Sequence, residues 1–282
     1  MKIKISLSRR VLLSITGVIT LALVVMLCVF DEIVLDGFTR LEEREVQTNL
    51  ERAKNSINSE LVELARICAD WARWDDARDF VLGKKPDFIE SNLRADSVSN
   101  LNFNFMMFVD GSGKIVHISA VDPETAEYIL LPQGITDRVL ASQPLLTMTE
   151  PKDSKSGLII LPEEIIMVAA QPISNGAAEK PVSGTLIIGR YLNERTIKRL
   201  SKRTQLDIGI MRGDVPAHSY EASANLLSKD IIEGYTNFSN LDGSKHITLK
   251  SPFYCTGVKD KKCLLRLFFP HKQKNIIKML YN

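Results

Sequence analysis

The sequence predicts an α+β protein in which a long N-terminal helix continues from a transmembrane helix and packs on an antiparallel sheet. Three observations support this. An uncharged run of twenty residues lies near the N-terminus, and about forty residues of helical periodicity follow it. Beyond residue 103, short apolar or alternating stretches are separated by turn residues, which is the pattern of strands.

The uncharged run, residues 11–30, predicts a membrane anchor. At 1.5 Å per residue a helix of this length spans roughly 30 Å, the thickness of a bilayer's hydrocarbon core. Because four cations precede it and acids follow it, residues 1–10 are expected in the cytoplasm and residues 31–282 outside. A cleaved signal peptide is the alternative, but the run exceeds a signal core and no A-x-A-like site follows.

Composition excludes several classes of protein. The chain has 282 residues, 45% of them hydrophobic and 25% charged, as expected for a folded chain. The net charge is only +2, and the basic excess lies in the first ten residues. A strongly basic nucleic-acid binder is therefore excluded, and no nucleic-acid partner is expected.

Two of the four cysteines suit an oxidising compartment. Cys255 and Cys263 flank TGVKDKK between two apolar runs, and strands joined there would bring the sulfurs together. These two cysteines either form a hairpin disulfide or stay as two unpaired thiols, and the sequence does not distinguish the two. The spacing does not fit a zinc site, and no metal is expected.

Residues 38–80 have the periodicity of one long helix. Its apolar face recurs in steps of three and four residues, from Leu50 through Ala53, Ile57 and Leu61 to Leu64. This face either packs on the domain or forms the seam of a homodimeric coiled coil, and both can hold in different parts of the helix. We expect a homodimer through these five residues of the N-terminal helix.

The remaining elements follow from turn and capping residues. The segment 83–86 ends the long helix, and Asp110-Gly-Ser-Gly113 is the turn of a hairpin. Asn193 is the expected N-cap of a helix over 194–203. Helices are also expected at 87–101 and 136–142, strands at 157–161, 165–173, 183–191, 206–211, 246–250 and 263–269, and a loop at 213–223.

Catalytic chemistry has little support in the sequence. The four histidines are far apart, and no nucleophile, metal or phosphate-loop motif occurs. We therefore expect a protein that is not an enzyme and needs no cofactor.

Aromatic, acidic and basic residues concentrate in two segments, WARWDDARDF and GTLIIGRY. A ligand pocket between the end of the long helix and the sheet would combine an aromatic wall, carboxylates and a cation. The competing interpretation is structural, with the tryptophans wedging the helix onto the sheet and the acids in ion pairs. The candidate ligand-binding residues are Trp71, Trp74, Asp75, Asp76, Arg190 and Tyr191.

The order of these motifs resembles the fourth class of CHASE domains, extracellular sensory modules of bacterial and archaeal receptors. The resemblance covers about residues 38–211 and rests on W-x-x-W-D-D, a hairpin with V-D-x-x-G, and G-x-L-I-x-G-R. It implies a PAS/Cache-like antiparallel sheet outside the membrane. It also implies signal transfer to a histidine kinase, diguanylate cyclase or phosphodiesterase.

These observations together predict a single-pass, inner-membrane-anchored extracytoplasmic sensor for an unknown small ligand. Because no output domain follows residue 211, the chain is expected to be a truncated receptor or a stand-alone sensor with a signalling partner. The alternative is an anchored periplasmic structural or protein-interaction domain that has no small-molecule ligand. A concave pocket with converging polar groups would favour the sensor.

Overall fold

The computed structural model divides the chain into two compact units. The smaller comprises residues 1–48, 224–234 and 252–282, and the larger comprises residues 49–223 and 235–251. The residues described are 7–29, 36–179, 181–212, 223–228, 231–243 and 246–254.

Helix α1 (Leu7–Val29) contains the predicted membrane segment. Its apolar stretch Leu7–Leu27 is the one helix among the described residues that is long and apolar enough to cross a membrane. None of this stretch is buried within the protein, as expected for side chains that lipid would surround. The prediction that this helix runs on into the next falls on residues 30–35, which lie outside the described residues.

Helix α2 (Asp36–Ala72) is the long helix that the periodicity predicted. In the larger unit its apolar stripe is buried in a core shared with five strands of the main sheet, at Ala53, Ile57, Leu64 and neighbouring positions. Cys68 lies so close to the sheet that its thiol donates to the carbonyls of Ala169 and Leu186, at 3.6 and 3.4 Å. This burial raises the pKa of the Cys68 thiol well above its ordinary value.

The long helix ends earlier than predicted. It stops at Ala72, whose carbonyl accepts a hydrogen bond from the Ser174 amide at 3.1 Å, and Trp74 is extended. A separate helix α3 (Asp75–Val81) then begins. The chain leaves this helix through Gly83, which has a φ of +73° that favours glycine. The prediction of one helix to residue 80 was therefore wrong, because the sheet caps the helix eight residues sooner.

The main sheet is antiparallel, with strand order β3-β2-β1-β6-β5-β4. Strands β1 and β6 pair from Phe105↔Gly189 to Asp110↔Gly184, which places the hairpin beside the GTLIIGR strand. The predicted α+β fold with a long helix on an antiparallel sheet is thus confirmed. The strands are β1 (Phe105–Asp110), β2 (Ile115–Asp122), β3 (Glu127–Tyr128), β4 (Lys155–Ile160), β5 (Ile165–Ile173) and β6 (Gly184–Tyr191).

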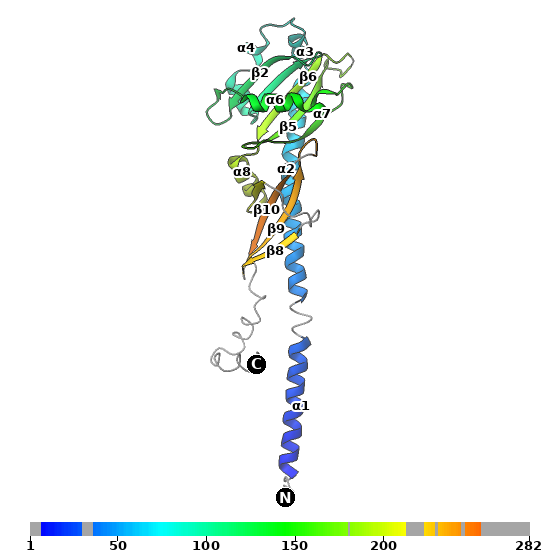
Figure 1. Ribbon diagram of the computed structural model, residues 1–282, viewed down its shortest axis with the longest axis vertical. Coiled ribbons are helices and arrows are strands. Elements are labelled where there is room, and N and C mark those ends of the chain that lie inside the picture. Colours follow the sequence, from blue (N-terminus) through cyan, green and yellow to red (C-terminus); the bar gives the residue numbers. More distant parts are fainter. Residues whose placement is uncertain are drawn as a thin grey trace. The chain divides into compact units, whose positions relative to one another are not determined.

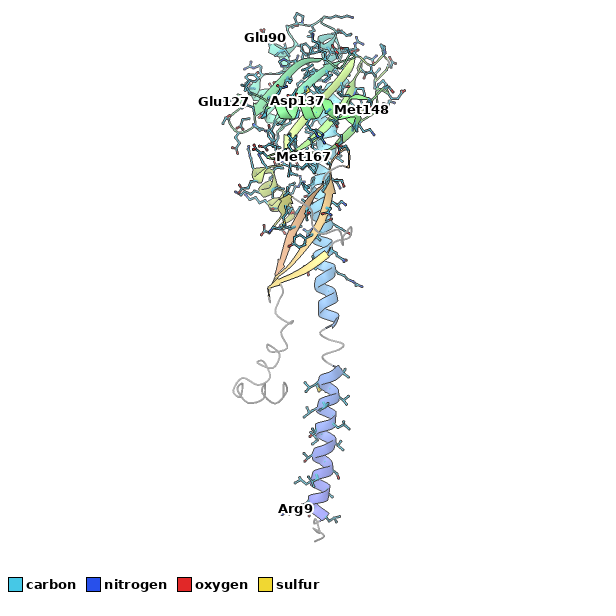
Figure 2. The ribbon with its side chains drawn as sticks, in the orientation of Figure 1. Arg9, Glu90, Glu127, Asp137, Met148 and Met167 are labelled. Carbon is cyan, nitrogen blue, oxygen red and sulfur yellow. The ribbon has the colours of Figure 1, made fainter. Side chains whose placement is uncertain are left out.

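Both faces of this sheet are covered (Figure 1). Alternate residues of β1, β5 and β6 point into two apolar clusters, one with α2 and α3 and the other with α6 (Gln133–Ala141) and α7 (Gln143–Leu146). Figure 2 labels Met167, in the α2 cluster, and Met148, in the α6 cluster. Strands buried on both faces explain why the sequence of β5 and β6 is nearly continuously apolar.

The glycines of GTLIIGR allow close packing against β1. A methyl group on Gly189 would overlap the ring of Phe105, and one on Gly184 would overlap the Val109 carbonyl. The motif therefore reflects backbone and ring contacts between paired strands rather than a phosphate-binding loop.

The predicted hairpin turn at Asp110 and the predicted helix N-cap at Asn193 are confirmed. The Asp110 carboxylate accepts hydrogen bonds from Ser112 and from the Lys114 amide, and these bonds lower the pKa of Asp110. Helix α8 (Glu194–Thr204) begins at Asn193, whose side chain accepts from the Thr196 amide at 3.0 Å. The helix predicted over 87–101 is two short helices, α4 (Phe88–Asn92) and α5 (Ala95–Asn100).

A second sheet has the strand order β7-β10-β9-β8. Its apolar residues Ile247 and Leu249 join the α2 side of the core together with Ile208, just before β7, and Leu200 of α8. The predicted loop 213–223 lies outside the described residues except for Ser223, which begins β8, and Cys255, Cys263 and the strand at 263–269 lie entirely outside them. The strands are β7 (Gly209–Arg212), β8 (Ser223–Ser228), β9 (Ile231–Ser239) and β10 (His246–Tyr254).

The face of α2 that was expected to form a dimer seam is not available for one. Leu50, Ala53, Ile57, Leu61 and Leu64 are all buried, and four of them lie in the core of the larger unit. The prediction of a homodimer seam on this face is wrong, because the domain's own sheet covers it.

A charge placed on this face should therefore unfold the domain rather than dissociate a dimer. We expect Ile57→Lys to lower the free energy of unfolding by at least about 3 kcal/mol, because Ile57 is fully buried. Val62→Lys, at a residue 68% exposed on the same helix, should change it by less than about 0.5 kcal/mol. Urea unfolding followed by circular dichroism measures both, and equal effects would contradict the burial of this face.

Candidate functional site

The tryptophans of the predicted site lie where α2 gives way to α3. Trp71 is buried in the core, and Trp74 stacks on it with ring centroids 4.6 Å apart. They meet although Trp74 lies outside α2, because the chain turns back after Ala72. The outer indole is 38% exposed, so this end of the helix presents an aromatic surface to solvent.

The two acids of the predicted site are in the first turn of α3. Asp75 lies 3.8 Å from Arg78 and accepts from the Gly176 amide at 3.4 Å. Asp76 pairs with Lys85 at 2.7 Å, which raises the pKa of the lysine. These contacts tie α3 to its own following turn and to the loop after β5.

Arg190 and Tyr191 lie at the opposite end of the sheet from the tryptophans. Gly184, at the start of β6, pairs with Ile173 beside the end of α2, and Arg190 is six residues further along β6. At about 3.3 Å per residue this separation is about 20 Å. The structure therefore brings Trp71, Trp74, Asp75 and Asp76 together but does not bring Arg190 and Tyr191 to them.

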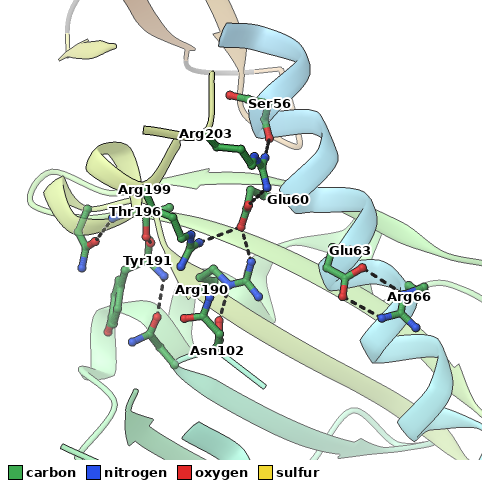
Figure 3. A network of polar contacts seen from close by, with 12 residues as sticks. Ser56, Glu60, Glu63, Arg66, Asn102, Arg190, Tyr191, Thr196, Arg199 and Arg203 are labelled. Atoms are coloured by element: carbon green, nitrogen blue, oxygen red, sulfur yellow. Dashed lines mark hydrogen bonds and ion pairs between the residues drawn. The ribbon is translucent and has the colours of Figure 1, made fainter. Parts of the chain in front are cut away.

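Arg190 belongs instead to an ion cluster centred on Glu60 of α2 (Figure 3). Its guanidinium donates to the Glu60 carboxylate, and both side chains are at most 7% exposed. Arg199 and Arg203 of α8 donate to the same carboxylate, each at 2.9 Å. Three guanidinium groups from a strand and a helix thus converge on one buried carboxylate of α2.

Arg190 is held on its other side by the segment before β1. Its Nε donates to the carbonyl of Asn102, a residue with a φ of +55°. The neighbouring Asn104 side chain accepts from the Tyr191 amide at 2.9 Å, and Thr196 donates to the Tyr191 carbonyl at 2.8 Å. Burial lowers the pKa of Arg190, while the Glu60 charge opposes that shift.

Burial also affects two other titratable side chains near the sheet. It raises the pKa of Tyr191 at the end of β6 and lowers the pKa of His117 on β2, where the imidazole contacts the ring of Phe80 edge-on. Neither side chain has a nucleophile–base partner among the contacts of the described residues. Within those residues, no three metal-ligating side chains gather either.

A polar hollow of about 440 Å³ lies at the tryptophan end of α2. Arg66 in its wall is bound in a bidentate pair to Glu63, at 2.8 and 3.1 Å. Asp70 and Arg73 have no ion pair or hydrogen bond within the described part of the chain. We call it the α2 pocket, and it is lined by Arg66, Ala69, Asp70, Arg73, Trp74 and Gly176.

Residues 56–210 match the CHASE4 domain family, and this segment is more than half of the chain. The chain belongs to the CHASE4 family. The match covers α2 from Ser56, the whole main sheet and α8, so the α2 pocket and the Glu60 cluster both lie within the CHASE4 domain. The family expected from the motifs is thus confirmed.

A relative of this CHASE4 chain is a regulatory histidine kinase. The chain is 28% identical over 201 residues to the methanogenesis regulatory histidine kinase FilI of Methanothrix harundinacea (strain 6Ac). That match covers 71% of this chain but only 23% of the kinase. The matched region is therefore a minor part of a longer protein in that relative.

A solved extracellular domain shares the fold of the CHASE4 chain. The extracellular domain of vpHK1S-Z8, described as a histidine kinase, superposes with a TM-score of 0.54 at 12% identity, covering 78% of this chain and 93% of that one. The periplasmic domain of Vibrio cholerae LuxQ gives a TM-score of 0.47 at 10% identity, covering 75% and 99%. The first of these supports the fold alone.

Glu60, Arg199 and Arg203 were not predicted as site residues from the sequence. A signal for Glu60 was present, because it occupies a position in the apolar stripe between Ile57 and Leu64, where a charge needs a partner. The identity of that partner depends on the pairing of β6 with β1 and on the direction of α8. Neither can be obtained from local spacing.

Removing an arginine of the Glu60 cluster should destabilise the CHASE4 domain more, the more deeply that arginine is buried. We expect Arg190→Ala to lower the free energy of unfolding by about 3–5 kcal/mol, because it leaves Glu60 with its buried partner removed. Arg203→Ala should cost at most about 1 kcal/mol, because this arginine is 51% exposed. Chemical denaturation of both variants tests this, and an Arg190→Ala domain as stable as the wild type would contradict it.

Proposed function

We propose that this chain is the membrane-anchored sensory part of a signalling receptor. In this proposal the CHASE4 domain detects a small ligand outside the cytoplasmic membrane, and α2 carries the response toward α1. The observation that supports it is the arrangement of α2, which lines the α2 pocket at one end and holds the Glu60 cluster about 15 Å away along the same helix. A displacement at the pocket would therefore act on the cluster through one rigid element.

The output in this proposal comes from another protein domain, and the chain itself catalyses no reaction. A histidine kinase is the favoured partner, because FilI is described as one. A diguanylate cyclase is the second candidate. Trp71, Trp74, Asp75 and Asp76 form the ligand-side region, whereas Arg190 and Tyr191 belong to the coupling side.

A kinase chimera tests signal transfer. The matched region of FilI would be replaced by the corresponding region of this chain, and autophosphorylation would be measured in membrane vesicles. We expect Arg203→Ala to change kinase activity on the order of fivefold, since it removes one contact of Glu60 without unfolding the domain. Asp96→Asn, at an exposed pair with Arg94, is the matched control and should have no effect.

Two outcomes would count against this proposal. An active chimera whose activity is the same with and without Arg203→Ala would show that the Glu60 cluster does not transmit a signal. An equal change with Asp96→Asn would show that any surface charge has the same effect.

The proposed location is the cytoplasmic membrane, with residues 1–10 inside and residues 31–282 outside. The positive charges before α1 support this orientation. An alkaline phosphatase fused after Asn282 should be active, because that enzyme folds only in the oxidising periplasm. A cytoplasm-only reporter that is active at the same position would reverse the orientation.

A homodimer is also part of the proposal. Since the sheet covers the buried face of α2, a helix-mediated interface would use the opposite face, where Val62 is 68% exposed. The Val62→Lys variant described above, which should fold like the wild type, tests this by sedimentation in detergent. A wild-type chain that stays monomeric at high concentration, or a variant that still dimerises, would exclude this interface.

A further inference from the structure

The α2 pocket contains a cation that lacks a partner. Arg73 lines the hollow, and its Nε is buried without a hydrogen-bond acceptor in the part of the chain that the structure describes. A buried guanidinium N–H without an acceptor is destabilising. Because that atom is shielded from solvent, a carboxylate in the hollow would instead pair with the charge of the Arg73 guanidinium, a group that a carboxylate can bind through two oxygens.

The same pocket contains an anion that lacks a partner. Asp70 is three residues before Arg73 on α2, a spacing that usually allows an ion pair. No such pair forms within the described residues. Arg66, one turn earlier, is held by both oxygens of Glu63, and Asp70 acts on it only through its charge, which helps to raise the pKa of Arg66. The pocket thus presents one unpaired cation and one unpaired carboxylate side by side.

Trp74 gives the pocket an aromatic wall. Trp71 supports the indole from the core side by stacking, so the ring is fixed while its outer part stays open to solvent. The negative face of an indole attracts an ammonium group and also packs against short aliphatic carbons. At about 440 Å³ the hollow is within the range of small-molecule sites.

We propose that the α2 pocket binds a small zwitterion, with its carboxylate on Arg73 and its ammonium group between Asp70 and Trp74. This inference rests on the proposed sensory function and names the chemical class of the ligand. A phosphate-rich ligand fits less well, because only one of the two arginines in the wall is free of a carboxylate partner.

Tryptophan fluorescence can report on this pocket directly. The chain has only two tryptophans, Trp71 and Trp74, and both lie at the site. The full chain in detergent would be titrated with glycine, β-alanine and γ-aminobutyrate, three zwitterions of increasing length. Acetate and methylammonium are the controls that carry one charge each. We expect a saturable change with at least one zwitterion at a Kd below about 1 mM, and at least tenfold weaker binding of both controls.

Variants of the two unpaired residues complete the test. Arg73→Gln and Asp70→Asn should each weaken binding at least about tenfold, whereas Asp96→Asn should leave it unchanged. Asp70 is exposed, so Asp70→Asn should fold. Its affinity therefore tests the proposal even if Arg73→Gln does not fold.

Three results would overturn the proposal. They are the absence of a saturable change with all three zwitterions, unchanged affinity in Asp70→Asn, and acetate binding as tight as that of the best zwitterion. The last result would reduce the pocket to a simple anion site. None of these readouts uses kinase activity. A chimera that fails to signal while the chain still binds a zwitterion would therefore contradict the proposed signal transfer but not the proposed binding site.

Discussion

The buried carboxylate of Glu60 is the interaction on which the arrangement of this domain depends. It lies within the apolar stripe of α2, where an unpaired charge would oppose folding. Its partners come from β6 and α8, and Arg190 is in turn held by the Asn102 carbonyl. The helix, the central strand, the segment before β1 and the following helix are therefore fixed to one another, because none can move far without leaving a buried charge unpaired.

The three arginines of the Glu60 cluster differ in how deeply they are buried, and this difference gives them different roles. Arg190 is almost fully buried with Glu60, so this pair is expensive to break. Arg199 and Arg203 are 37% and 51% exposed, and water can replace their contacts at small cost. In the proposed function, a movement of α8 along α2 would exchange the outer contacts while the inner pair stays intact, as in a switch between two arrangements.

The sequence predicted what local chemistry determines. Helical periodicity identified α2, Asp110 identified the hairpin turn, and Asn193 identified the start of α8. Prediction from the sequence failed where contacts between distant segments determine the structure. The Ser174 amide ends α2 before residue 80, and the sheet covers the stripe that could equally have been a dimer seam. The six candidate site residues looked like one group because each segment contains an aromatic side chain and a charged one, yet antiparallel pairing puts Arg190 and Tyr191 at the far end of β6.

The packing of the sheet also explains why a site on α2 is well placed for signalling. Side chains of β1, β5 and β6 fill both faces of the sheet, so a ligand entering there would have to displace a close-packed core. The α2 pocket instead lies on the outer side of the helix, where binding displaces only water. In the proposed function, a ligand at Arg73 and Trp74 would act on a helix whose opposite face is packed against the sheet. The displacement would pass along α2 to Glu60, where the more exposed outer arginines would give up their contacts first.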